Sequence, residues 1–315
     1  MASFFDEVRA IVLNKGTKKE KVDRLQKELK VTRYEAETFY TQLSAELSII
    51  RATTLMPTGG AKMRFTMGVE IECFNLEKAA IRAAIQARGL KAHITGYDHH
   101  DSKDSYKLGY DGSIDGNDSC ELVSPILKSL KSLETVCEVI NEAGARVNKS
   151  CGLHVHLGAE KITLEQWCRI VLNYAAIEAV IDSFQPRSRR ANNNTYCATI
   201  TGECAGRVRE LYDDIKCGET KTMSDLQRCF NYDRYHKVNV MAWDAHKTIE
   251  FRQHGGTTDY EKIKNWIGFL TALVSWSIAH EELLSGCNTI DDLPFLNRAQ
   301  KKFYNERKSH FEIFG

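Results

Sequence analysis

The sequence lacks the features that several common protein classes require. Its 43 basic and 42 acidic residues leave a formal net charge of +1, which gives no electrostatic reason to expect nucleic acid or membrane binding. The most apolar stretch, residues 266–279, is too short and too interrupted by polar residues for a membrane span. Neither a Walker phosphate loop nor a Rossmann glycine fingerprint occurs. Two common ways of holding nucleotide phosphates are therefore excluded.

The ten cysteines are scattered along the chain and include no Cys-x-x-Cys pair. This argues against paired-cysteine zinc sites and against a thioredoxin-like redox motif. The first residues turn acidic early and lack the basic-then-apolar pattern of a secretory signal. We therefore expect a cytoplasmic protein in which most cysteines are reduced, small core residues.

Three short segments carry an alternation of apolar and chemically active residues: 68–72 (GVEIE), 152–156 (GLHVH) and 249–252 (IEFR). Successive side chains of a β-strand point to opposite faces of the sheet. Each segment therefore predicts a strand with one apolar face and one face of metal- or phosphate-binding groups. The pairs predicted to share a face are Glu70 with Glu72, His154 with His156, and Glu250 with Arg252. Together they indicate a sheet with an active site on one face.

Two neighbouring carboxylates on one strand face, such as Glu70 and Glu72, repel each other unless a cation lies between them. Hard oxygen ligands of this kind suit Mg²⁺ or Mn²⁺, although glutamates are also common on solvent-exposed strands. His154 and His156 fit either a zinc site or an arrangement in which one histidine binds a metal and the other contacts substrate. Their alternative is a pair of hydrogen-bonded histidines.

Glu250 with Arg252 fits a site where a carboxylate holds a metal and the guanidinium holds phosphoryl oxygens. A cross-strand salt bridge is the alternative. Residues 111–116 (DGSIDG) resemble the start of a calcium loop, but the twelfth position is Leu122 instead of glutamate. We reject that loop and keep Asp111 and Ser113 as candidate substrate contacts.

Strands and helices are mixed along the chain without strict alternation, which favours an α+β fold with a mostly antiparallel sheet. Capping-box patterns at Thr17 and Thr32 predict helices in an N-terminal extension, residues 1–60. The extension is expected to pack on the main domain or on a partner subunit. A catalytic domain (61–288) and a helical tail (289–315) follow. The expected elements include helices from Ser124 to Glu142 and from Tyr260 to Leu284, and a strand from Lys237 to Ala242.

Taken in order, seven segments resemble those of the amidoligases, carboxylate–amine ligases of the glutamine synthetase-like superfamily. The resemblance covers roughly residues 65–284. The segments are 68–72, 111–113, 121–125, 152–156, 188–190 with 196–197, 234–239, and 249–252. Each is weak alone, and their order along the chain is what makes the resemblance specific.

The resemblance implies a curved, mostly antiparallel glutamine synthetase-like sheet with helices on its outer side, and a site that holds ATP with two or more Mg²⁺ or Mn²⁺ ions. The implied metal ligands are Glu70, Glu72, Glu121, Glu250 and one of the pair His154 and His156. Arg252 would steady the transferred phosphoryl group. Asn239 and Arg189 would border the substrate, and Asp111 is the candidate general base. Arg190 belongs to a basic loop that fits nucleotide phosphates or a carboxylate substrate, with a solvated loop as the alternative.

The implied reaction activates a carboxylate with ATP and joins it to an amine, with small-molecule or peptide acids and amines as substrates. The acid and the amine are not identified by the sequence. Two alternatives stay open at this point. One is a zinc-dependent hydrolase built on His154 and His156, and the other is a non-catalytic binding module that keeps this fold.

Overall fold

The computed structural model describes residues 11, 17–41, 65–95 and 104–314. By its contacts the chain divides into two compact units, Met1–Thr54 and Leu55–Gly315. The predicted domain boundaries at residues 60 and 288 stay predictions.

Capping boxes begin two helices in the described part of the N-terminal unit. Thr17 accepts a hydrogen bond from the backbone N–H of Glu20 and caps α2 (Lys18–Leu29), while the Glu20 carboxylate bonds the Thr17 N–H at 2.7 Å. The same reciprocal bonds join Thr32 and Glu35 before the helix that begins at residue 33. The described part of this helix ends at residue 41, and the rest of the predicted helix lies outside the described residues. Among the described residues of this unit, the buried side chains of the hydrophobic cluster are Ile11, Val22, Leu25 and Ala36.

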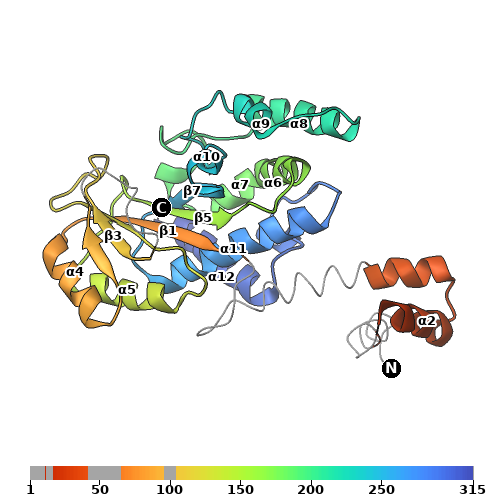
Figure 1. Cartoon of the computed structure of the whole chain (residues 1–315), viewed down its shortest axis with the longest axis horizontal. Helices are drawn as coiled ribbons and strands as arrows, with labels where there is room; N and C mark the ends of the chain where they lie inside the picture. Colours follow the sequence, from red (N-terminus) through yellow and green to blue (C-terminus); the bar gives the residue numbers. More distant parts are fainter. Residues whose placement is uncertain (1–10, 12–16, 42–64, 96–103, 315) are drawn as a thin grey trace. The chain divides into compact units, whose positions relative to one another are not determined.

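The larger unit contains a seven-stranded sheet in the order β2-β3-β4-β1-β5-β7-β6. All neighbouring strands are antiparallel except the pair β2 and β3. The predicted α+β class with a mostly antiparallel sheet is thereby confirmed (Figure 1). The strands are β1 (Met67–Cys73), β2 (Ala92–Ile94), β3 (Tyr106–Gly109), β4 (Cys120–Val123), β5 (Gly152–Gly158), β6 (Val238–Asn239) and β7 (Thr248–Gly255).

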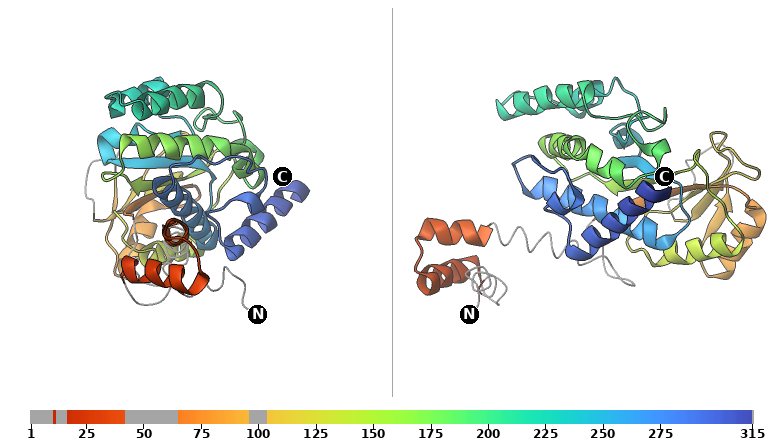
Figure 2. Two further views of the ribbon diagram at one scale, coloured as in Figure 1. Left: turned by 90° about the vertical axis from the view of Figure 1, so that its right-hand side faces the viewer. Right: turned by 180° about the vertical axis from the view of Figure 1, so that it is seen from behind.

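Helices follow or connect the strands. The long helix α11 packs against α5, α6 and β5, and α12 lies beside α11, where the Tyr304 hydroxyl donates to the Asn265 carbonyl (Figure 2). The helices of this unit are α4 (Lys78–Ala87), α5 (Lys131–Glu142), α6 (Leu164–Ala176), α7 (Glu178–Ser183), α8 (Glu203–Lys216), α9 (Met223–Cys229), α10 (Ala242–His246), α11 (Tyr260–Ala279) and α12 (Arg298–Phe314), with 3-10 turns at η1 (Arg187–Arg189) and η2 (Ile290–Asp292).

The apolar residues of the central strands face the helices, as the alternation predicts. The Phe251 ring of β7 lies 5.7 Å from the Tyr174 ring of α6. Removing such side chains from water contributes about 1.5–3 kcal/mol each. The fully buried strand residues of this face include Val69, Ile71, Leu153, Val155, Leu157 and Phe251. Because these side chains occupy one face, the charged residues between them are directed to the other.

Three predicted elements have different bounds. The predicted helix start at Ser124 is wrong, because the Ser124 hydroxyl accepts from the Val69 N–H at 2.9 Å and keeps residues 124–127 beside β1; α5 begins at Lys131. Helix α11 ends at Ala279, since the next residue is in an extended conformation. The predicted strand 237–242 is reduced to Val238–Asn239, because α10 begins three residues later.

All ten cysteines are free thiols, and eight of them are buried, as expected for core residues. Within the described part of the chain, no helix is both long enough and apolar enough to cross a bilayer.

Candidate active site

Strand register brings the predicted charged residues of four strands together. β1 lies between β4 and β5, and β7 follows β5 in the sheet. Because directly opposed residues share a face, the three pairs project from the same side of the sheet. The opposed pairs are Glu72 with Glu121, Glu70 with His154, and His156 with Glu250. The structure therefore assembles all six residues that were predicted as metal ligands.

A β-bulge adjusts the position of Arg252. The register of β5 against β7 shifts between Leu153 and Val155, so that Arg252 and Gln253 lie opposite His154 alone. Arg252 reaches the carboxylates on the site face. Gln253 is fully buried and accepts a 2.5 Å hydrogen bond from a tyrosine of α6. One strand thereby supplies a site residue and, directly after it, a residue of the supporting core.

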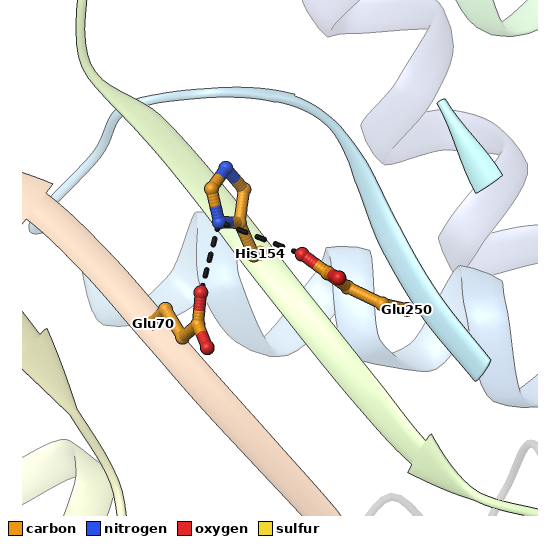
Figure 3. Close-up of side chains that lie close together, drawn as sticks. All are labelled: Glu70, His154 and Glu250. Carbon is orange, nitrogen blue, oxygen red and sulfur yellow. Dashed lines mark hydrogen bonds and ion pairs between the residues drawn. The ribbon is translucent and has the colours of Figure 1, made fainter. Parts of the chain in front are cut away.

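One group of candidate ligands consists of Glu70, His154 and Glu250, which come from β1, β5 and β7 (Figure 3). The Nδ1 atom of His154 lies 3.0 Å from Glu70 Oε2 and 3.7 Å from Glu250 Oε1. One donor atom from each residue falls within 4.8 Å of the others. These separations are compatible with a single cation held by all three groups.

A second group consists of Glu72, Glu121 and the same histidine. His154 Nε2 lies 3.4 Å from Glu72 Oε1, and Glu72 Oε2 accepts a 2.5 Å hydrogen bond from the Gly152 N–H. A neutral imidazole offers one lone pair and one N–H. His154 can therefore coordinate a cation in one group while it donates a hydrogen bond to a carboxylate of the other.

His156 has a buried nitrogen without a hydrogen-bond partner. Its Nδ1 bonds the Thr248 hydroxyl at 2.9 Å, whereas Nε2 lies 3.3 Å from Glu70 Oε1 and 3.9 Å from Glu250 Oε1 without hydrogen-bond geometry. Burial opposes protonation of this ring, but the neighbouring carboxylates Glu250 and Glu70 outweigh it and raise the pKa of His156. A buried polar atom of this kind is satisfied when it meets a ligand or a proton.

The carboxylates differ in their preference for the charged form. Burial, with Glu70, Asp111 and Glu72 nearby, raises the pKa of Glu121 well above its ordinary value. Burial also opposes the charge of Glu250, but the Arg252 guanidinium outweighs it and lowers that pKa. Burial is the largest cause at Glu121, so its carboxyl favours the neutral form, whereas Glu250 beside Arg252 keeps its charge.

The donor set fits divalent cations. Four carboxylates face two guanidiniums here, and their oxygens with one or two imidazole nitrogens are the ligands that Mg²⁺ and Mn²⁺ accept. His156 Nε2 lies within ion-pair distance of Glu70 and Glu250, so that the imidazoles and the carboxylates form one cluster of candidate ligands. Which side chains coordinate an ion, and which ion, stays a prediction.

Glu250 is held by two of the predicted site residues. Arg252 Nη1 lies 2.5 Å from Glu250 Oε1, and Asn239 Nδ2 donates to Glu250 Oε2 at 2.6 Å. Burial opposes the charge of Arg252, but Glu250 and Glu70 outweigh it and raise the pKa of the guanidinium. Arg252 is therefore a permanent cation beside the first ligand group.

Arg189 enters the site next to Gly152. A Cβ atom on Gly152 would lie 2.8 Å from His154 Nε2 and 3.1 Å from Arg189 Nη2, so that only glycine fits without displacement. The Arg189 side chain is buried, donates to the Ser150 carbonyl at 3.3 Å, and has an Nε without a hydrogen-bond partner. Sequence reasoning did not assign this spatial role to Gly152, because the residue carries no chemical group.

Asp111 and Arg190 differ in their relation to these groups. Asp111 is close enough to Glu121 to raise its pKa, and its carboxylate accepts the Ser113 N–H at 2.7 Å. Arg190 instead donates to the Gln185 carbonyl at 2.8 Å and stacks on the Phe311 ring of α12. These contacts do not join Arg190 to the carboxylates.

Comparison with known proteins shows the family of the chain. The family model described as "putative amidoligase enzyme" matches residues 63–274, and the chain belongs to this family. The match spans β1 to most of α11 and contains every predicted site residue. No curated protein matches the chain.

Proposed function

We propose that the protein is an ATP-dependent carboxylate–amine ligase that forms an amide bond through an acyl phosphate and releases ADP and phosphate. The observation that carries the proposal is the pair of ligand groups that share His154. Sites that transfer a phosphoryl group neutralise the charge of the phosphates with divalent cations and guanidiniums. The family supports a ligase activity, and the sheet would be of the glutamine synthetase-like type.

The proposed chemistry has two balanced steps. An oxygen of the substrate carboxylate attacks the γ-phosphorus of ATP, the bond to the β,γ-bridging oxygen breaks, and ADP leaves. An amine nitrogen then attacks the acyl carbon, phosphate leaves, and the amine loses a proton to form the amide. Bound Mg²⁺ or Mn²⁺ would supply positive charge along the phosphates.

The chain's own residues have separate parts in this proposal. Glu70 and Glu250 would hold one cation, Glu72 and Glu121 would hold the other, and Arg252 would stabilise the negative charge that develops on the transferred group. Asn239 keeps Glu250 oriented through its 2.6 Å hydrogen bond.

Three further residues are proposed to contact substrates. Arg189 fits a substrate carboxylate, because its guanidinium lies beside His154 and its Nε lacks a partner. Asp111 is retained as the candidate acceptor of the amine proton, close to Glu121. Arg190 is retained only as a candidate for binding the nucleotide phosphates, since its own contacts are with Gln185 and Phe311.

The zinc hydrolase alternative uses His154 and His156 as its main ligands. Both nitrogens of His154 face carboxylates, and His156 Nδ1 is engaged by Thr248. Oxygen donors therefore dominate each group, which favours Mg²⁺ or Mn²⁺ over zinc. The hydrolase predicts activity without ATP, and the binding module predicts no turnover.

The test is a phosphate-release screen of acid–amine pairs with ATP and Mg²⁺, followed by mass spectrometry of the product. We expect ADP only when an acid, an amine and Mg²⁺ are all present, and a product lighter by one water than the pair. Glu70→Gln and Glu72→Gln should each abolish turnover while the fold is kept. Hydrolysis of an amide without ATP, or near-normal turnover of both variants, would contradict the proposal.

A further inference from the structure

Lys237, Glu178 and Asp182 form a buried ionic network next to the segment that carries Arg189. The ammonium of Lys237 is completely buried and lies 2.7 Å from Glu178 Oε1 and 2.8 Å from Asp182 Oδ1, both on α7. Burying a lysine is costly unless charged partners surround it. The sequence places Lys237 in a predicted strand and in the segment 234–239, without a role of its own.

Each acid of the network also fixes backbone of the neighbouring loops. Glu178 Oε2 accepts the N–H groups of Ile200 and Thr201 at 3.0 and 3.2 Å. Burial opposes its charge, but Lys237 and these hydrogen bonds outweigh it and lower the pKa of Glu178. Asp182 Oδ2 accepts the Ala191 N–H at 2.8 Å. The network therefore anchors both ends of the segment that follows η1.

Gln253 connects this network to the active site. Its amide nitrogen donates to Asp182 Oδ1 and, at 3.3 Å, to the Arg189 carbonyl. The Tyr174 hydroxyl donates to its oxygen at 2.5 Å and fixes the orientation of the amide. Since Asp182 binds the N–H of Ala191, the backbone is held at Arg189 itself and again two residues later. Gln253 also directly follows Arg252, at the β-bulge.

We infer that Lys237, Asp182 and Gln253 are positioning residues that fix the Arg189 guanidinium beside Gly152 and His154. The inference rests on the proposed function, in which Arg189 binds the substrate carboxylate. A backbone held at the Arg189 carbonyl and again at the Ala191 N–H leaves mainly side-chain rotations for the guanidinium, so that its donors are aligned before the substrate arrives. When a supporting residue is changed and this alignment is lost, the reaction rate commonly falls by a large factor.

Gln253→Met is the first test variant, because methionine keeps the length of the side chain and adds no charge. Asn173→Leu is the matched control. Asn173 is an equally buried amide that bonds the Ser277 hydroxyl and the Leu284 N–H at 2.9 and 2.8 Å, away from Arg189. Both variants lose buried hydrogen bonds, and only Gln253→Met loses the link to Arg189.

Hydrogen–deuterium exchange of the purified full chain tests the link without any substrate. We expect Gln253→Met and Asp182→Asn to speed exchange at residues 187–191 by at least about tenfold, while peptides of β1 and β5 stay protected. Asn173→Leu should leave exchange at residues 187–191 unchanged. Equal exchange of this segment in Gln253→Met and the wild type would overturn the inference.

A double-mutant cycle tests whether the effect passes through Arg189. With the acid–amine pair found in the screen, Gln253→Met should lower kcat/KM for the acid by about 10- to 100-fold. In the Arg189→Ala background the same change should have little further effect, because residues that act in series are not additive. If the losses of kcat/KM in the two single variants multiply in the double variant, the inference is overturned. A protein without ATP turnover would contradict the proposed function, and the hydrogen–deuterium exchange result would then decide whether Gln253 positions Arg189.

Discussion

Glu70 faces His154 across the antiparallel pair β1 and β5, and its Oε2 atom lies 3.0 Å from the imidazole Nδ1. The other imidazole nitrogen lies 3.4 Å from Glu72 Oε1, two residues further along β1. One histidine thus contacts two carboxylates that the period of a strand places on the same face. The proposed adjacent cation sites follow from this relationship.

Replacing Arg252 with alanine should lower kcat by about 100- to 1000-fold, because its charge acts most strongly in the transition state. Binding of ATP with Mg²⁺, measured by calorimetry, should weaken much less. Arg252 also neutralises Glu250 at 2.5 Å, so Mn²⁺ affinity is measured alongside. An equal loss of kcat and nucleotide affinity would reduce Arg252 to a binding residue.

Gly152→Ala should damage the site although it adds a single methyl group. The added Cβ would lie 2.8 Å from His154 Nε2, which forces the imidazole or the Arg189 guanidinium to move. We expect a loss of at least about tenfold in turnover, with a smaller change in Tm.

Gly68→Ala is the control for this change, because Gly68 lies opposite His156 in the same sheet and a Cβ there would meet its nearest neighbour at 3.5 Å. That variant should keep most of the activity. If the two alanine variants behave alike, the space at Gly152 has no special role.

Glu121→Gln should stabilise the metal-free protein at neutral pH. The pKa of Glu121 is raised by burial and by Glu70, Asp111 and Glu72, so that the folded state binds a proton more tightly than the unfolded state does. The contribution of Glu121 to the free energy of unfolding therefore falls as the pH rises from its unfolded-state pKa of about 4.5 toward its higher folded-state pKa.

In EDTA at pH 7, the glutamine variant should melt at least about 2 °C above the wild type, and the difference should vanish near pH 4. With Mn²⁺ the order should reverse, because the variant loses a ligand. A wild type that is the more stable in EDTA at pH 7 would contradict the raised pKa.

The period-two pattern of the sequence was sufficient to place Glu70 with Glu72 and His154 with His156 on common faces. It could not give the register between strands, because hydrogen bonds between distant segments fix which residue lies opposite which. The sharing of His154 by two carboxylate groups depends on that register and emerges only from the structure.

Other features could not be predicted because contacts with distant parts of the chain determine them. Ser124 and Pro125 fit a helix start, yet a tertiary hydrogen bond from Val69 to the Ser124 hydroxyl takes the place of capping. The roles of Lys237 and Gln253 depend on partners some 55–71 residues away along the chain. The only local signal was a lysine next to apolar strand residues, which does not reveal its partners.

Titration with Mn²⁺, followed by electron paramagnetic resonance, measures how many cations bind at the proposed site and how close together they lie. We expect two bound ions per chain, close enough to be magnetically coupled, because both candidate ligand groups adjoin the His154 ring. His154→Ala should weaken both ions, while Glu121→Gln should weaken one. Binding of a single ion, of two uncoupled ions, or of ions whose affinity is unchanged in His154→Ala would contradict this expectation.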